Sequence, residues 1–74
     1  MKYQGIAHFG YEGNSPNSQV SFEVEASSVE DALYEGHRIL HSWGRNASRV
    51  EVTDEMGVSF SERWSNKDQR YIRG

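Results

Sequence analysis

The spacing of hydrophobic residues changes within residues 19–43, from every second position to every third or fourth. In residues 19–26 the hydrophobic side chains alternate with polar ones, as they do in a half-buried β-strand. These residues are Val20, Phe22, Val24 and Ala26. Further on, hydrophobic residues fall on one face of an α-helix. They are Val29, Ala32, Leu33, Gly36, Ile39, Leu40 and Trp43. This segment therefore predicts a strand followed directly by a helix.

Both ends of this helix, expected over about residues 28–43, carry terminal signals. Ser27 and Glu30 have the spacing of a capping box, so we expect Ser27 to cap the first turn. Gly44 suits the position just after the helix, where a left-handed backbone is common.

Three further segments have strand patterns. Residues 2–11 place alternate side chains toward a core, namely Tyr3, Gly5, Ala7, Phe9 and Tyr11. Residues 48–53 direct Val50 and Val52 inward. Residues 58–64 direct Val58, Phe60 and Trp64 inward, although Glu62 interrupts that pattern. A tight hairpin turn is expected at residues 54–57, with Gly57 in the left-handed conformation. Residues 12–18 read as a loop that projects into solvent.

Together these elements predict the α+β class, as a single β-β-α-β-β domain over residues 1–64. One helix packs on a four-stranded antiparallel sheet, because the helix has a single apolar face to cover. Residues 65–74 are polar and basic without periodicity, and we expect a flexible tail there.

Length and composition limit the classes of protein. The 74 residues leave room for one domain. There is no cysteine, which excludes disulfides and thiolate metal sites and fits a cytoplasmic location. No segment has the run of about 18 apolar residues that a membrane helix needs, and no signal peptide is evident. We therefore expect no membrane association.

Charge is distributed unevenly along the chain. The formal net charge is −3. Residues 1–35 contain one lysine and six acidic residues, whereas residues 36–74 contain seven basic and five acidic residues. The sequence pI of about 5.5 argues against the usual modes of duplex binding. It favours a protein partner with a basic surface.

Two strips of side chains are candidate protein-binding surfaces. One lies on the helix flank opposite the apolar face, and its residues are Glu30, Tyr34, His37 and His41. Alternatively, the Tyr34 ring packs along the helix beneath Arg38. The other strip is acidic and lies on the outward side of two strands, at Glu23, Glu25 and Glu51. Ordinary solubilising charge is the alternative there.

Neither a metal site nor catalysis is predicted. His37 and His41 are four residues apart, as in helical zinc sites, but Arg38 stands where the zincin pattern has glutamate and no third ligand is evident. No phosphate-binding glycine loop and no nucleophile motif are present. We expect no cofactor and no enzymatic activity.

The final residues suggest an alternative function. Basic and aromatic side chains are mixed there, and such a mixture can bind single-stranded nucleic acid. These residues are Arg63, Trp64, Lys67, Arg70, Tyr71 and Arg73.

Residues 22–33 and 50–57 resemble a pattern found in very small phage and mobile-element proteins. There, two strands, a helix with a Ser/Ala-rich cap and a closing hairpin make up the protein. Some anti-CRISPR proteins against type I surveillance complexes are similar in size and element order. The resemblance implies a non-catalytic inhibitor that covers the surface where a host complex binds nucleic acid. The expected function is therefore protein binding, with single-stranded nucleic-acid binding as the alternative.

Overall fold

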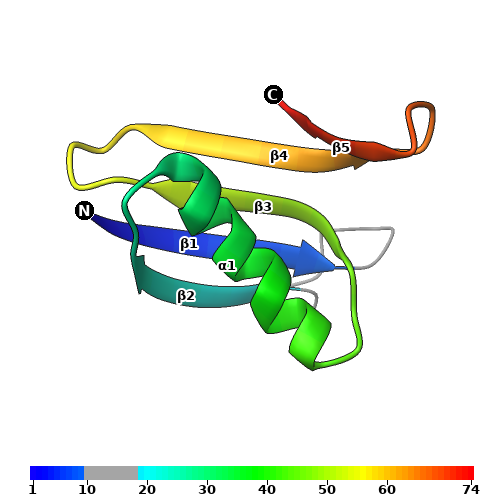
Figure 1. The fold of residues 1–74 in the computed structure, drawn as a ribbon, viewed down its shortest axis with the longest axis horizontal. Coiled ribbons are helices and arrows are strands. Elements are labelled where there is room, and N and C mark those ends of the chain that lie inside the picture. The colour runs from blue at the N-terminus through cyan, green and yellow to red at the C-terminus, as the bar shows by residue number, and fades with distance from the viewer. Residues whose placement is uncertain (10–18) are drawn as a thin grey trace.

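The computed structural model describes residues 1–9 and 19–74 and shows one helix packed on one face of an antiparallel sheet (Figure 1). The strands are β1 (Lys2–Phe9), β2 (Gln19–Glu25), β3 (Ala47–Thr53), β4 (Ser59–Ser65) and β5 (Arg70–Arg73), and the helix is α1 (Val29–Ser42). The strand order is β2-β1-β3-β4-β5. The α+β class and the single helix on an antiparallel sheet are confirmed. The predicted loop at residues 12–18, and Tyr11, lie outside the described residues.

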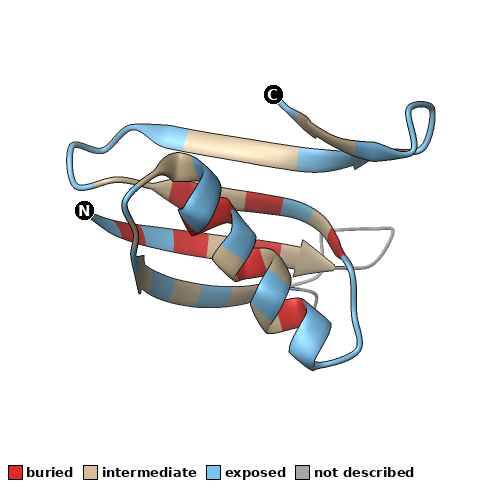
Figure 2. Cartoon of the chain, in the orientation of Figure 1, coloured by how far each residue is buried: buried red, intermediate tan, exposed pale blue. Residues whose placement is uncertain are grey.

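The strand register sets which side chains face α1. Gly5 lies opposite Phe22 of β2 and Val52 of β3, and Ala7 lies opposite Val20 and Val50. Residues directly opposite each other project from the same face of a sheet. The buried core therefore forms between α1 and the central strands (Figure 2). It contains Tyr3, Ala7, Ala32, Leu33, Leu40, Ala47, Val50 and Val52.

The helix begins one residue later than the sequence predicted. Ser28, not Ser27, is the N-cap, and its side chain accepts a hydrogen bond from the backbone N–H of Asp31 (3.2 Å). The Ser27 hydroxyl instead donates to the Asp31 carboxylate (3.0 Å). Two adjacent serines satisfy the same sequence pattern, so the pattern did not distinguish them.

Gly44 lies just after the helix, as predicted, and its φ is 74°. The Gly44 N–H donates to the His41 carbonyl (2.9 Å), and the Arg45 N–H donates to the Leu40 carbonyl (3.0 Å). This pair of bonds is the Schellman arrangement. Trp43 was predicted in the apolar stripe, but it is the C-cap and is 56% exposed, because the sheet does not extend beneath the last turn.

The turn before β4 has the predicted left-handed glycine, because Gly57 has a φ of 84°. The Asp54 carboxylate accepts hydrogen bonds from the N–H groups of Met56 (2.9 Å) and Val58 (3.0 Å). Val58 was predicted to point inward but is exposed, because it belongs to this turn and β4 starts one residue later.

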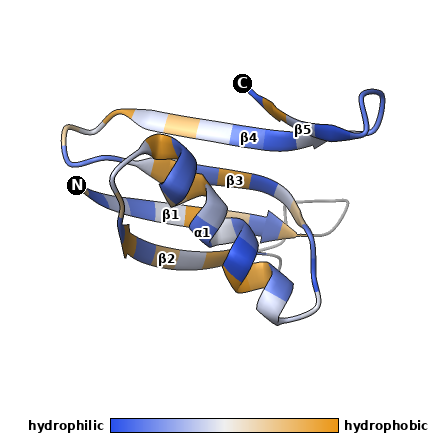
Figure 3. Cartoon of the chain, in the orientation of Figure 1, coloured by the Kyte–Doolittle hydropathy of each residue, from blue (hydrophilic) through white to orange (hydrophobic). Residues whose placement is uncertain are grey.

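The sheet has five strands, so the prediction of four strands is wrong. Residues 65–74, expected as a tail, contain the end of β4, a turn and the fifth strand. Trp64 lies opposite Tyr71, and their rings meet edge to face with centroids 5.1 Å apart. Gln69 adopts a φ of 55° in the turn. The strand is only four residues long, too short for alternation to reveal it. The second half of β4 and this turn are hydrophilic (Figure 3).

Candidate functional site

A groove lies between α1 and the β4–β5 hairpin, because the helix packs on β1 and β3 and leaves the hairpin largely uncovered (Figure 1). Its volume is about 630 Å³. We call it the helix–hairpin groove. Its lining residues are Tyr34, His37, Arg38, His41, Ser42, Arg45, Asn46, Ala47, Glu62 and Tyr71.

An acid–imidazole pair forms the floor of the helix–hairpin groove. Glu62 lies opposite Val50 in the β3–β4 register, so its side chain faces α1. There the Glu62 carboxylate meets Nε2 of His37 at 2.5 Å, and the two side chains are 20% and 21% exposed. Glu62 is therefore the inward residue that interrupts the strand pattern, and His37 supplies the polar partner that a half-buried carboxylate requires.

Tyr71 forms one wall of the groove. Its ring packs edge to face against His37, with centroids 4.4 Å apart. Its hydroxyl donates a hydrogen bond to the Ala47 carbonyl (2.6 Å), which joins β5 to the start of β3. Burial, and next the negative charge of Glu62, raise the pKa of the Tyr71 hydroxyl above its ordinary value. These contacts hold the floor and the wall in one arrangement.

Two hydroxyl groups of the groove donate to backbone carbonyls. Ser42 donates to the Ile39 carbonyl (2.6 Å), as Tyr71 does to Ala47. His37 directs Nε2 at Glu62 instead of at a hydroxyl. A nucleophile is normally activated by a base within hydrogen-bond reach, and this geometry does not provide that contact.

The predicted helix strip is divided by the fold. Tyr34 is 65% exposed and, with exposed His41, borders the groove. His37 points into the floor. Glu30 forms an ion pair with Arg73 (3.0 Å) and thereby connects α1 to β5. A backbone hydrogen bond, and next the hydrogen bond from Arg73, lower the pKa of Glu30.

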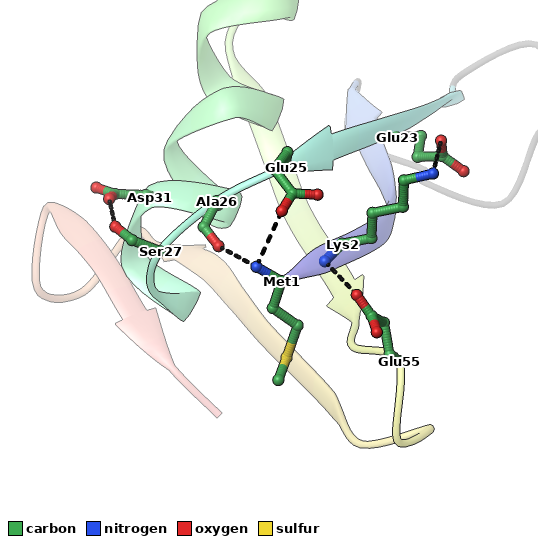
Figure 4. Close-up of polar contacts among 8 residues, drawn as sticks. All are labelled: Met1, Lys2, Glu23, Glu25, Ala26, Ser27, Asp31 and Glu55. Atoms are coloured by element: carbon green, nitrogen blue, oxygen red, sulfur yellow. Dashed lines mark hydrogen bonds and ion pairs between the residues drawn. The ribbon is translucent and has the colours of Figure 1, made fainter.

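The predicted acidic strip lies on the outer face, the sheet face turned away from α1. Each of its carboxylates has a cation nearby, as Figure 4 shows for the first two. The pairs are Glu23 with Lys2 (3.9 Å), Glu25 with the Met1 amino group (3.3 Å) and Glu51 with Arg49 (3.0 Å). All six groups are at least partly exposed. The outer face therefore carries mixed charge, which weakens the attraction expected for a basic partner.

The β4–β5 hairpin carries the cations that the sequence assigned to a tail. Arg63, Lys67 and Arg70 are exposed and form no ion pair with any other described residue. Nearby Trp64 is 38% exposed on the helix-facing side. Arg63 and Arg70 belong to the outer face in the strand register, so the hairpin carries its basic and aromatic groups on opposite faces.

Comparison of the chain with protein-family models, curated proteins and solved structures gives no match. Over residues 1–9 and 19–74, no helix is both long and apolar enough to cross a membrane. Within the same residues, no three histidine or acidic side chains are grouped to hold a metal ion. What the protein does is therefore inferred from the surfaces described above.

Proposed function

We propose that the protein is a non-catalytic protein-binding module that contacts its partner through the helix–hairpin groove. The observation that carries this proposal is Tyr34, an aromatic residue 65% exposed on the border of the groove. Tyrosine is enriched among the residues that supply most of the binding energy at protein interfaces. A large exposed ring beside a hollow is a suitable anchor for a partner side chain.

The internal contacts of the groove support binding with little reorganisation. His37, Glu62 and Tyr71 are fixed by mutual packing and by the bond to the Ala47 carbonyl. Side chains that are already ordered lose less conformational entropy on association. The volume of about 630 Å³ is within the range of sites that take a ligand or several side chains.

A partner with a basic surface fits the net negative charge of the chain. Of the two arginines in the lining, Arg38 pairs with Glu35, and Arg45 lies over the Phe9 ring, 4.8 Å from its centroid. The Glu62 carboxylate at the floor is paired with His37, and the net charge of the chain is −3. A lysine or arginine of the partner would meet the exposed Tyr34 ring, where cation–π contact adds to the attraction.

Affinity capture with an exposed-residue control tests this proposal. The tagged protein, its Tyr34→Ala variant and Met56→Ala are each used to capture partners from the source cell. Met56 is 80% exposed in the turn before β4, far along the sheet from the groove lining. Tyr34→Ala should weaken the captured complex roughly 30-fold, as expected for an aromatic anchor. Equal binding by all three proteins would contradict the role of the groove.

A narrower form of the proposal is inhibition of a nucleic-acid-binding complex. It rests on the resemblance of residues 22–33 and 50–57 to small phage inhibitors and on the net negative charge, which suits a surface that binds nucleic acid. A type I surveillance complex should lose affinity for its target DNA when the protein is added, but not when Tyr34→Ala is added. Unchanged DNA affinity would leave only the general binding proposal.

Single-stranded nucleic-acid binding is the second candidate. It is favoured by the exposed cations Arg63, Lys67 and Arg70 on the β4–β5 hairpin, which also carries the partly exposed Trp64 on its other face. Affinity for a mixed-sequence oligonucleotide should then fall steeply with salt and drop in Arg70→Ala. Absence of binding at low salt would exclude this function.

A further inference from the structure

The two edge strands of the sheet differ in how well they resist pairing with another chain. β5 is four residues long and has arginine at both ends, features that protect an edge. β2 is seven residues long and contains neither proline nor a register shift. Within the part of the chain that the structure describes, its only neighbour is β1. β2 is therefore the edge that is open to an added strand.

The hydrogen-bond pattern shows which backbone groups of β2 face outward. The Ala26 N–H donates to the Met1 carbonyl (3.0 Å), and the Met1 amino group donates to the Ala26 carbonyl (3.1 Å). Hydrogen-bonded pairs alternate along an antiparallel ladder. Residues 20, 22 and 24 therefore bond to β1, while residues 19, 21, 23 and 25 direct their N–H and C=O groups away from the sheet.

We propose that β2 pairs antiparallel with β2 of a second copy, with Phe22 at the two-fold axis, to form one continuous sheet. In this register all seven residues of the strand overlap. Ser21 of one copy exchanges backbone hydrogen bonds with Glu23 of the other, and Gln19 does so with Glu25. The outward groups of both edges are then satisfied, as backbone groups in a sheet require.

The charges on β2 favour this register over its neighbours. With Phe22 at the centre, both glutamates face neutral side chains. A centre at Glu23 places Glu23 opposite its own copy, and a centre at Val24 places Glu23 opposite Glu25. Like charges directly opposite each other destabilise a strand pair. A centre at Ser21 also avoids like charges, but only residues 19–23 then overlap. The register centred at Phe22 is therefore the one that pairs the whole strand without opposing like charges.

The helix-facing side of β2 also lacks cover. Val20, Phe22 and Val24 are only half-buried. The last turn of α1 projects past β2 (Figure 1), and it ends at Trp43, which is 56% exposed. In the antiparallel dimer, the strand of the second copy lies beneath this overhang. Trp43 then packs over Val24 of the second copy.

This interface and the proposed partner site lie on opposite sides of the helix. The groove is on the flank that faces β4 and β5, whereas the dimer uses the flank beyond β2. Two copies therefore present two open grooves. A test of the dimer is therefore independent of a test of the proposed function.

Sedimentation equilibrium over micromolar to millimolar concentrations tests the dimer and its register. Ser21→Glu places a charge opposite Glu23 of the second copy twice, and should raise the dissociation constant roughly 2- to 30-fold. Ser21→Lys creates two attractive pairs and should lower it. Ser59→Glu adds the same charge to the outer face on β4, away from the edge, and serves as the matched control.

The dimer is overturned if the parent protein stays monomeric over the whole range. The register is overturned if Ser21→Glu and Ser21→Lys shift the constant in the same direction, or if Ser59→Glu acts as strongly as Ser21→Glu. Trp43→Ala should weaken the dimer. The monomer should stay folded, because Trp43 is exposed in it. A dimer that is unaffected by Trp43→Ala would contradict the contact with the second copy.

Discussion

At the scale of the residue, Gly36 sets how close α1 lies to the sheet. A Cβ at this position would lie 2.6 Å from Cγ1 of Val50 and 3.1 Å from the Phe22 ring. In an exposed helix, replacing glycine by alanine stabilises by about 1 kcal/mol. Here the added methyl group must displace two packed side chains.

We therefore expect Gly36→Ala to lower the free energy of unfolding by about 1–3 kcal/mol, the usual cost of overpacking. Urea unfolding measures this change. In a Val50→Ala background the contacting methyl groups are gone, so the same substitution should cost less. A stabilised Gly36→Ala protein would mean that the helix lies farther from the sheet.

Tyr71 makes the free energy of unfolding decrease at alkaline pH. Burial and Glu62 raise its pKa above the ordinary value of 10.0, so folding favours the neutral phenol. This stabilisation is complete below pH 10 and is lost as the pH rises through the folded-state pKa. Tyr71→Phe should cost about 1 kcal/mol at neutral pH, because the bond to the Ala47 carbonyl is lost.

Above pH 10 the difference between Tyr71→Phe and the parent should shrink, since only the parent must keep a buried phenol neutral. Urea unfolding of both proteins at pH 7 and above pH 10 measures this difference in the free energy of unfolding. Tyr34→Phe changes an exposed position, so its free energy of unfolding should equal that of the parent at both pH values. A difference that grows with pH would contradict the burial of Tyr71.

At the scale of the element, the helix is held by its apolar face. Leu33 is 2% exposed and belongs to the core against the sheet. Leu33→Ala should destabilise the protein by about 2–4 kcal/mol, because it leaves a cavity. Thermal or urea unfolding checks this, with exposed Tyr34→Ala as the control that changes little. A near-zero effect would place the helix on another face.

The fifth strand is the element that most needs a direct test. Gly74 donates to the Ser61 carbonyl (3.1 Å), so by alternation the Ile72 N–H bonds to β4, while those of Tyr71 and Arg73 point away. Amide hydrogen exchange followed by NMR should therefore be slower at Ile72 than at its two neighbours. Uniformly fast exchange in residues 70–73 would support the tail that the sequence predicted.

The sequence predicted elements whose signals are local. The change of hydrophobic period predicted β2 and α1, and the left-handed positions at Gly44 and Gly57 were predicted from turn chemistry. The groove could not be predicted, because His37 and Glu62 are 25 residues apart and meet only through the order of β3 and β4. Of the predicted helix strip, Tyr34 and His41 border the groove.

At the scale of the whole molecule, the protein has three surfaces that differ in chemistry. Among residues 1–9 and 19–74, the helix–hairpin groove offers aromatic walls, the β4–β5 hairpin offers cations without an ion pair, and the β2 edge offers backbone groups without a strand partner. Near β1 and β2 the outer face carries charges that are paired within the chain. Each surface predicts a different kind of contact, so the location of binding distinguishes the proposed functions.

The central claim is that a protein partner binds in the helix–hairpin groove, and a titration followed by two-dimensional NMR tests it most directly. The labelled protein is titrated with the partner recovered by affinity capture. We predict that the shifted amide signals cluster at Tyr34, His37, His41, Arg45 and Tyr71. Shifts confined to residues 63–70, or to the outer face, with the groove signals unchanged, would contradict the account.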